Sequence, residues 1–232
     1  YAGRTCLPYI RVPIMYRCLS PSRHIRPCQA REVLRAARHS YRTARTLNWV
    51  ATIDFGWPDL GQELLPSRTF RAIRRRVCAW WDYKRKKGLV EGPICDLAVW
   101  EAPNGKHHVN WMLHIPEPLH DEARAVIASR TRKVMGEHPE DTLHQQAIYN
   151  LNGLLPYVVK GTEPDYAEKI GVTPVDQGAI WFRRAVPSMS LGRAARERDW
   201  ENGRIINGER ARGLPFPREK CVMDMREGAA VG

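Results

Sequence analysis

The 232-residue sequence contains no apolar run that approaches the roughly 18 residues needed to cross a membrane. The apolar stretches near its N-terminus are short and are interrupted by arginine and proline, which is not the pattern of a signal peptide. We therefore expect a cytoplasmic protein with no membrane partner. The length suits one domain with appendages or two small ones, and it is sufficient for a substantial core.

The cysteines are few in number and irregularly spaced, six in 232 residues. None of the six cysteines forms a C-x-x-C pair, so the spacing typical of zinc fingers is absent. The irregular spacing also argues against a disulfide framework, and it indicates free thiols in a reducing compartment. The sequence also lacks a Walker A motif and any internal repeat. The cysteines are Cys6, Cys18, Cys28, Cys78, Cys95 and Cys221.

Acidic residues are few in the first part of the chain. Residues 1–46 hold ten arginines and a single acid, Glu32, and the whole chain has a formal net charge of +12. Such clustering favours a polyanionic partner, nucleic acid rather than a membrane surface, although a merely solvated basic surface is the simpler alternative. A second basic cluster follows residue 67. From it we predict nucleic-acid contacts by Arg71, Arg74, Arg75, Lys84, Lys86 and Lys87.

The pattern of apolar residues predicts an α+β fold, an antiparallel sheet with helices packed on it. We expect a basic N-terminal arm with a helix (1–46), a central domain (47–161) and a weakly structured C-terminal extension with a basic helix (162–232). Within the central domain, Ser67 is a candidate N-cap for a helix that runs to about Lys87. The elements predicted are strands at 47–55, 95–101, 107–115 and 179–185, and helices at 29–46, 67–87, 119–135, 141–151, 157–160 and 190–200.

The segment E-A-P-N-G-K-H-H-V-N, residues 101–110, is typical of a β-hairpin. Asn104–Gly105 is the strongest short-range signal for a two-residue turn between strands. With that turn, Glu101 pairs with His108, and Asn110 shares the sheet face of His108 because side chains alternate along a strand. A carboxylate, an imidazole and an amide carbonyl are ligands that Mg²⁺ or Mn²⁺ could accept there.

A second constellation follows in Y-V-V-K, residues 157–160. Gly153 is expected to break the preceding helix, and Pro156 suits the first turn of a short new helix. Tyr157 and Lys160 would then lie on one face, three residues apart. A tyrosine hydroxyl is a poor nucleophile near neutral pH, but a neighbouring cation and a metal at the electrophile make attack on phosphorus feasible.

The hairpin E-x-x-N-G-x-H-H-V-N followed by the helical Y-V-V-K resembles the rolling-circle replication initiators of the HUH endonuclease superfamily. The resemblance covers roughly residues 47–161. It implies an HUH/RRM-like sheet and metal ligation by Glu101, His108 and Asn110. It also implies Tyr157 as the nucleophile that nicks and joins single-stranded or hairpin DNA, with Lys160 assisting. The absent Walker A motif then implies a borrowed host helicase, and the family implies a plasmid or phage replicon in a bacterial host.

The sequence departs from the family at Asn110, where the second metal histidine is expected. Two alternatives therefore stay open: a non-catalytic DNA-binding protein, and a related transposase or relaxase. Three further residues near these motifs are candidates for the site. We expect His114 to be a satisfied sheet residue, Tyr149 to pack in the core rather than serve as a second nucleophile, and Asp54 to form a turn.

Overall fold

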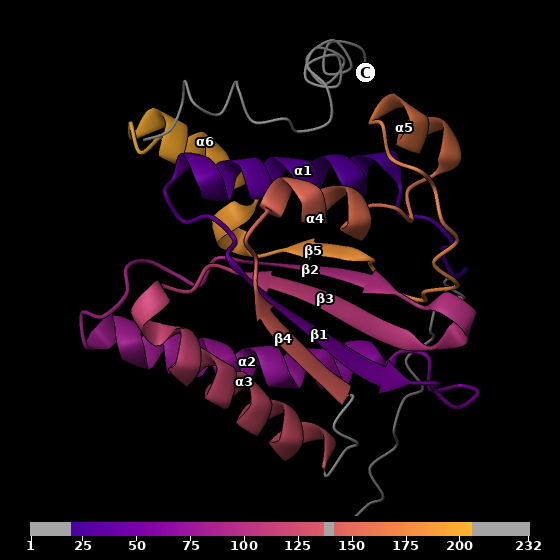
Figure 1. Ribbon diagram of the computed structural model, residues 1–232, viewed down its shortest axis with the longest axis horizontal. Coiled ribbons are helices and arrows are strands. Elements are labelled where there is room, and N and C mark those ends of the chain that lie inside the picture. The colour runs from indigo at the N-terminus through magenta and orange to yellow at the C-terminus, as the bar shows by residue number, and fades with distance from the viewer. Residues whose placement is uncertain (1–19, 137–141, 206–232) are drawn as a thin grey trace, which may run out of the picture.

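The computed structural model describes residues 20–136 and 142–205 (Figure 1). No helix in these described ranges is both long enough and apolar enough to span a membrane. The helices are α1 (Pro27–Arg42), α2 (Leu65–Lys86), α3 (His120–Met135), α4 (Leu151–Val158), α5 (Pro164–Lys169) and α6 (Arg193–Glu201). The strands are β1 (Trp49–Gly56), β2 (Asp96–Glu101), β3 (His107–Leu113), β4 (Leu143–Ala147) and β5 (Ala185–Pro187). Short 3₁₀ turns are η1 (Pro103–Gly105), η2 (Glu117–Leu119) and η4 (Met189–Leu191).

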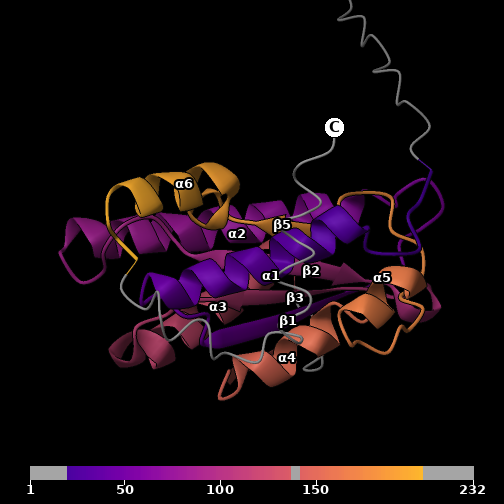
Figure 2. The same ribbon diagram turned by 90° about the horizontal axis from the view of Figure 1, so that it is seen from above.

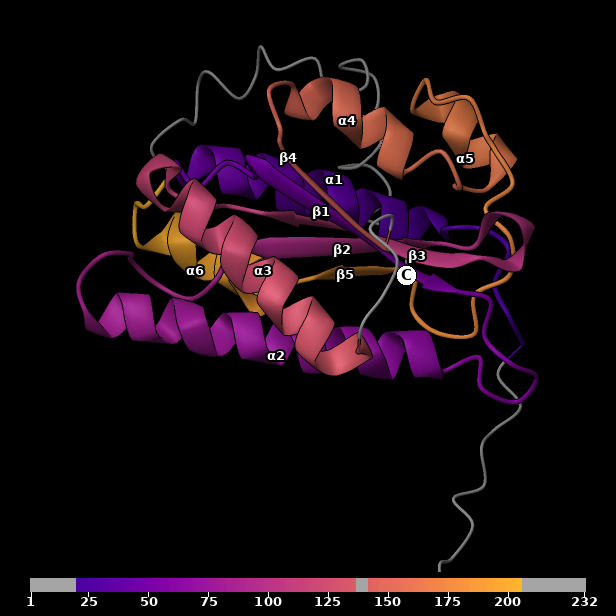
Figure 3. The same ribbon diagram turned by 60° about the horizontal axis from the view of Figure 1, so that its bottom comes forward.

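The five strands form one antiparallel sheet in the order β4-β1-β3-β2-β5, which confirms the predicted α+β class. The hairpin strand β3 is in the centre, between β1 and β2. Helices cover both faces: α1 and α4 lie on one, and α2 and α3 lie on the other (Figures 1 and 3). Seen from above, α1 crosses the sheet between α6 and α4 (Figure 2).

Alternating side chains divide the sheet into two hydrophobic layers, as expected for a sheet covered on both faces. One layer joins Val50, Val99 and Met112 to buried residues of α1 and α4. The other is rich in aromatic side chains, and in it Trp100 and Trp111 pack edge-to-face on Phe70 of α2. Glu101 follows Val99 by two residues and Asn110 precedes Met112 by two. Both therefore belong to the face covered by α1 and α4.

The hairpin forms in the predicted register, with Glu101 opposite His108. Asn104 and Gly105 both have positive φ, 54° and 81°, as the centre of a type I′ turn requires. The Lys106 amide closes the turn by donating to the Pro103 carbonyl at 3.1 Å. Asparagine and glycine tolerate this left-handed backbone better than other residues, which is why the dipeptide could be read from the sequence.

Four predictions about the type or bounds of elements were wrong. The strand predicted at 179–185 lies further along the chain, because β5 comprises Ala185–Pro187 and pairs there with β2. The segment predicted as a helix at 141–151 contains β4, which pairs with β1 along its whole length. An unpaired β1 edge would leave backbone N–H and C=O groups without partners, and strand pairing outweighs local helix preference here. Helix α2 begins at Leu65 rather than at Ser67. Helix α4 runs through both Gly153 and Pro156.

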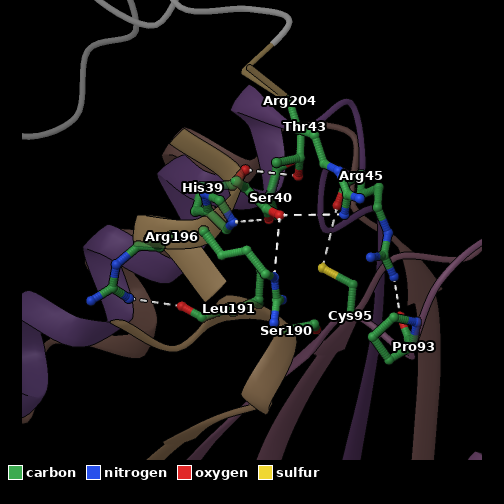
Figure 4. A network of polar contacts seen from close by, with 12 residues as sticks. His39, Ser40, Thr43, Arg45, Pro93, Cys95, Ser190, Leu191, Arg196 and Arg204 are labelled. Atoms are coloured by element: carbon green, nitrogen blue, oxygen red, sulfur yellow. Dashed lines mark hydrogen bonds and ion pairs between the residues drawn. The ribbon is translucent and has the colours of Figure 1, made fainter. Parts of the chain in front are cut away.

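The described chain on either side of 47–161 belongs to the same layers. Helix α1 contributes Val33, Leu34 and Ala37 to the core, and β5 extends the sheet by pairing with β2. Helix α6 is fastened to α1, where His39 Nε2 lies 3.0 Å from Asp199. Beside this contact, Arg196 of α6 donates to the Leu191 carbonyl at 2.7 Å (Figure 4). The predicted arm before residue 20 and the tail after residue 205 lie outside the described residues.

Candidate functional site

Three side chains of the hairpin converge on the face of the sheet below α4. The Glu101 carboxylate is 2% exposed, and its Oε1 accepts a hydrogen bond from Asn110 Nδ2 at 2.6 Å. Its other oxygen, Oε2, lies 3.3 Å from His108 Nε2. On the neighbouring strand, Thr52 Oγ1 donates to Asn110 Oδ1 at 3.0 Å. The sheet therefore brings together the carboxylate, imidazole and amide that the sequence predicts as one site.

The Y-V-V-K segment meets this patch from above. Lys160 Nζ lies 3.2 Å from Glu101 Oε2 and 3.4 Å from the centre of the Tyr157 ring. Tyr157 is 51% exposed, so its ring borders solvent next to the buried carboxylate. Lys160 does not lie on the helix as predicted, because α4 ends at Val158. The turn that follows nevertheless keeps Lys160 against Tyr157, since the Lys160 amide donates to the Tyr157 carbonyl at 3.3 Å.

Helix α4 is capped at its start and attached to the segment 175–184 after its end. At its start, Asn150 caps the helix by accepting a hydrogen bond from the Gly153 amide at 3.0 Å. At its end, the Lys160 carbonyl accepts from the Val175 amide at 2.8 Å. The segment 175–184 then passes along β2, where the Ala102 amide donates to the Gln177 carbonyl at 2.8 Å. This segment thus connects Lys160 to the strand that carries Glu101.

Glycine is required where this segment passes the hairpin. Gly178 has φ +65°, and a Cβ built on it would lie 1.8 Å from the Ala102 carbonyl oxygen. No side chain fits such a close approach. The position of the 175–184 segment beside Glu101 therefore depends on Gly178.

The residues present fit a single cation, provided that Asn110 turns. Two nitrogen atoms already lie close to Glu101 Oε2, where a cation would contact the carboxylate. They are Lys160 Nζ and His108 Nε2. Asn110 directs its NH₂ group rather than its carbonyl toward Glu101. A rotation of the amide by about 180° would present the oxygen instead, and the Thr52 hydroxyl can then accept where it now donates.

A metal site on this hairpin depends on Asn110 as a ligand. Within residues 20–136 and 142–205, no three His, Cys, Asp or Glu side chains gather closely enough to hold a metal ion. A site built on Glu101 and His108 therefore needs the amide oxygen as its third protein ligand. Amide and carboxylate oxygens suit Mg²⁺ and Mn²⁺ better than soft metals.

The three other candidate residues either lie outside this group of side chains or have hydrogen-bond or ion-pair partners. His114 Nδ1 lies 2.9 Å from the Thr46 carbonyl oxygen, as expected for a satisfied sheet residue, and burial lowers its pKa. Tyr149 is 96% exposed, so the prediction that it packs in the core was wrong. Asp54 does accept from the Gly56 amide in a turn, and it also pairs with Lys106 at 2.6 Å. Asp54 is opposite His108 in the β1–β3 pairing, so it is a second carboxylate on this face.

The basic residues of α2 lie on the opposite face of the sheet from Glu101 (Figures 1 and 3). Two of the six predicted nucleic-acid contacts have carboxylate partners. Arg74 binds the buried Asp96 with two hydrogen bonds of 2.6 and 2.9 Å, and this contact raises the pKa of Arg74. Lys84 pairs with Glu122 at 2.6 Å. Arg71, Arg75 and Lys86 are exposed on α2, and Lys87 is exposed directly after it.

Substitution of Arg74 should destabilise the fold rather than weaken a phosphate contact. Arg74→Ala leaves the Asp96 carboxylate buried with Trp111 Nε1 as its remaining side-chain donor, at 2.8 Å. We expect a loss of about 2–4 kcal/mol in the free energy of unfolding, below the range for fully buried pairs because Arg74 is partly exposed. Urea denaturation would measure it, with exposed Arg75→Ala as the matched control. Equal stability of the two variants would contradict this assignment.

Sequence reasoning missed two parts of the site. Thr52 holds the Asn110 amide, but a threonine in an apolar strand gives no signal until the β1–β3 register is known. The segment 175–184 forms one wall, and it has little regular structure from which to predict it. The features of its sequence that could indicate a structural role are Gly178 and the apolar residues that follow it.

Comparison with protein-family models finds no match to this chain, and comparison with curated proteins finds none either. The function is therefore inferred from the site geometry and the motifs.

Proposed function

We propose that this protein is a metal-dependent endonuclease and strand transferase that nicks and joins single-stranded DNA through Tyr157, as a rolling-circle replication initiator does. The observation that carries the proposal is the contact of Lys160 with both Glu101 and Tyr157. It links the two motifs, which lie more than 45 residues apart in the sequence, into one half-buried site. A tyrosine that only packs in the core would not be half exposed, with its ring against an ammonium group that is paired with a buried carboxylate.

In the proposed reaction, the Tyr157 hydroxyl oxygen attacks the scissile phosphorus. A bond forms between the Tyr157 oxygen and phosphorus, and the phosphate stays on the 5′ end of the downstream strand. The bond from phosphorus to the 3′ oxygen breaks, and that oxygen takes up a proton in place of the one that tyrosine loses, which leaves a free 3′-OH. The resemblance to the initiator family supplies this polarity. Joining is the reverse reaction, in which a 3′-OH attacks the phosphotyrosine. No energy-rich cofactor is needed, because one phosphodiester linkage replaces another.

Each residue has a separate task in this proposal. Glu101, His108 and Asn110 would hold one Mg²⁺ or Mn²⁺, which would supply charge stabilisation at the phosphate oxygens. Lys160 lies between the carboxylate and the Tyr157 ring, where its ammonium group can hold a phosphate oxygen next to the nucleophile. Thr52 orients the Asn110 amide. Burial of Glu101 excludes water and strengthens all of these charge interactions.

The distribution of charge supports DNA binding on the same face. Helix α1 lies on the face of the sheet that carries Glu101, and its partly exposed side is lined with arginines. These are Arg31, Arg35, Arg38 and Arg42, spaced three or four residues apart as on one side of a helix. Arg35 is paired with Glu32 at 3.4 Å, a contact that a phosphate would have to replace. Such a row can follow a phosphate backbone toward Tyr157. In this proposal α1, rather than α2, contacts the strand that is cut.

A non-catalytic DNA-binding protein is the second candidate. The hydrogen bond from Asn110 Nδ2 to Glu101 favours it, because that bond satisfies both groups without a metal. A transposase or relaxase would share the proposed chemistry and differ in its DNA target.

A nicking assay separates the candidates. We expect the protein to cut labelled single-stranded DNA in Mn²⁺ or Mg²⁺, to leave one product covalently attached, and to be inactive in EDTA. The substrate should be a pool of random-sequence oligonucleotides, because the target sequence is unknown. The adduct is detected as labelled DNA that migrates with the protein in denaturing gels. DNA binding without any adduct in either metal would favour the non-catalytic candidate.

A further inference from the structure

A cavity of about 230 Å³ opens at the edge of the sheet, close to the hairpin. It lies between the chain that leads into α1 and the segment that precedes β5. Its walls include Ser22, Arg26, Gln29, Trp181, Phe182 and Arg183. Neither α2 nor the Glu101 carboxylate contributes to these walls. The cavity is therefore distinct from the candidate site described above.

The cavity is rigidly built, because a buried arginine holds its two walls together. The Arg184 guanidinium is fully buried and donates to the carbonyls of Ser22 and Gly178, with the Ser22 contact at 2.5 Å. Its Nε also donates to Ser22 Oγ at 3.1 Å. Burial lowers the pKa of Arg184 to about 10. Two backbone hydrogen bonds between Ser22 and Ile180, of 2.8 and 3.0 Å, also join the two walls.

The cavity shares a wall with the candidate site. Two backbone hydrogen bonds of 2.8 Å join the segment 175–184 to the hairpin. The Trp100 amide donates to the Arg184 carbonyl, and the Ala102 amide donates to the Gln177 carbonyl. The segment therefore runs beside Glu101 before it forms the cavity. The opposite wall is anchored to the same place, because the Ile25 amide donates to the Gly161 carbonyl at 2.8 Å, next to Lys160.

The exposed groups of the cavity suit a nucleotide. The Trp181 ring is 36% exposed, and it is followed by Phe182, whose ring packs 4.8 Å from that of Trp100. Arg26 and Arg183 are exposed at the rim, and no ion pair within residues 20–136 and 142–205 involves either side chain. An indole offers a stacking surface for any base, and guanidinium groups bind phosphate.

We propose that this cavity binds one nucleotide of the DNA strand that is cut, with its base stacked on Trp181 and the flanking phosphates on Arg26 and Arg183. The proposal rests on the proposed function for the identity of the ligand. It adds a second contact point, which would fix the register of the strand relative to Tyr157. Stacking would provide affinity without reading the base, because every base has a π face.

The test is a binding titration in EDTA, which prevents cleavage. Fluorescence anisotropy of a labelled oligothymidylate would be measured for the wild type, Trp181→Ala, Trp181→Phe and Trp200→Ala at several salt concentrations. Trp200 is the matched control, because it is 70% exposed on α6 and away from the cavity. We expect Trp181→Ala to weaken binding about 5- to 150-fold, Trp181→Phe to weaken it less, and Trp200→Ala to have no effect.

The salt dependence separates stacking from charge. Trp181→Ala should leave the log–log slope unchanged, whereas Arg26→Ala and Arg183→Ala should each reduce it by about 0.7. Arg76→Ala, exposed on α2, should leave the slope unchanged. Equal affinities of Trp181→Ala and Trp200→Ala would overturn the cavity proposal alone. A wild type that binds no oligothymidylate would overturn DNA binding itself, and with it the proposed function.

Discussion

Tyr157→Phe should abolish covalent attachment to DNA and leave DNA binding nearly unchanged. The substitution removes one hydroxyl oxygen from a ring that is half exposed, so neither the core nor the Lys160 contact with the ring is lost. Without that oxygen no phosphotyrosine can form, and the rate of adduct formation should fall by at least about 10⁴-fold. The adduct would be measured with labelled single-stranded DNA in Mn²⁺, and binding by anisotropy in EDTA.

Tyr149→Phe provides the matched control for this experiment. Tyr149 is even more exposed and lies before α4, eight residues from Tyr157. We expect adduct formation at the wild-type rate. If Tyr157→Phe keeps the adduct and Tyr149→Phe loses it, the nucleophile is Tyr149 and the role assigned to the Lys160–Tyr157 contact is wrong. Persistence of the adduct in both variants would exclude either tyrosine as the sole nucleophile.

The parts of the site that could be predicted from the sequence are those determined by local rules. Asn104–Gly105 defines a type I′ turn through backbone sterics, and the turn determines the pairing of Glu101 with His108. Alternation along β3 then places Asn110 on the same face. The proximity of Tyr157 to Lys160 follows from their spacing in the chain. None of these inferences depends on contacts that are distant in sequence.

The remaining features depend on tertiary contacts. Residues 143–147 form a strand because the β1 edge needs a partner, and their own sequence does not reveal it. Helices α1 and α2 cover opposite faces of the sheet, so the basic residues of α1, and not those of α2, lie on the face of Glu101. A count of charges along the sequence cannot show on which face each cluster lies. Likewise, the orientation of the Asn110 amide depends on Thr52 from another strand. The buried Arg184 has no sequence signal, because arginine is rarely buried.

Glu101→Gln should remove metal binding and nicking while the fold is retained. Glutamine has nearly the same shape, and its one carbonyl oxygen can still accept from Lys160. Its NH₂ group can donate to Asn110 Oδ1 once the Asn110 amide turns. It lacks the negative charge that a divalent cation requires from this site, since His108 and Asn110 are both neutral ligands. We expect Mn²⁺ affinity to fall by more than about 100-fold, because loss of even an outer partner of a metal ligand typically costs 10- to 100-fold. The rate of adduct formation should fall by about 10³-fold or more.

Two readouts make the test of Glu101→Gln independent of activity. Electron paramagnetic resonance of free Mn²⁺ reports metal binding directly, and thermal unfolding checks that the hairpin is intact. The control is Asp54→Asn, which removes the neighbouring carboxylate opposite His108 that is paired with Lys106. It should change Mn²⁺ affinity by less than about tenfold, because a carboxylate outside the ligand set acts only through its charge. If Asp54→Asn abolishes Mn²⁺ binding and Glu101→Gln does not, the metal lies on the β1 side of His108. Glu101 would then serve only to anchor Lys160 and Asn110.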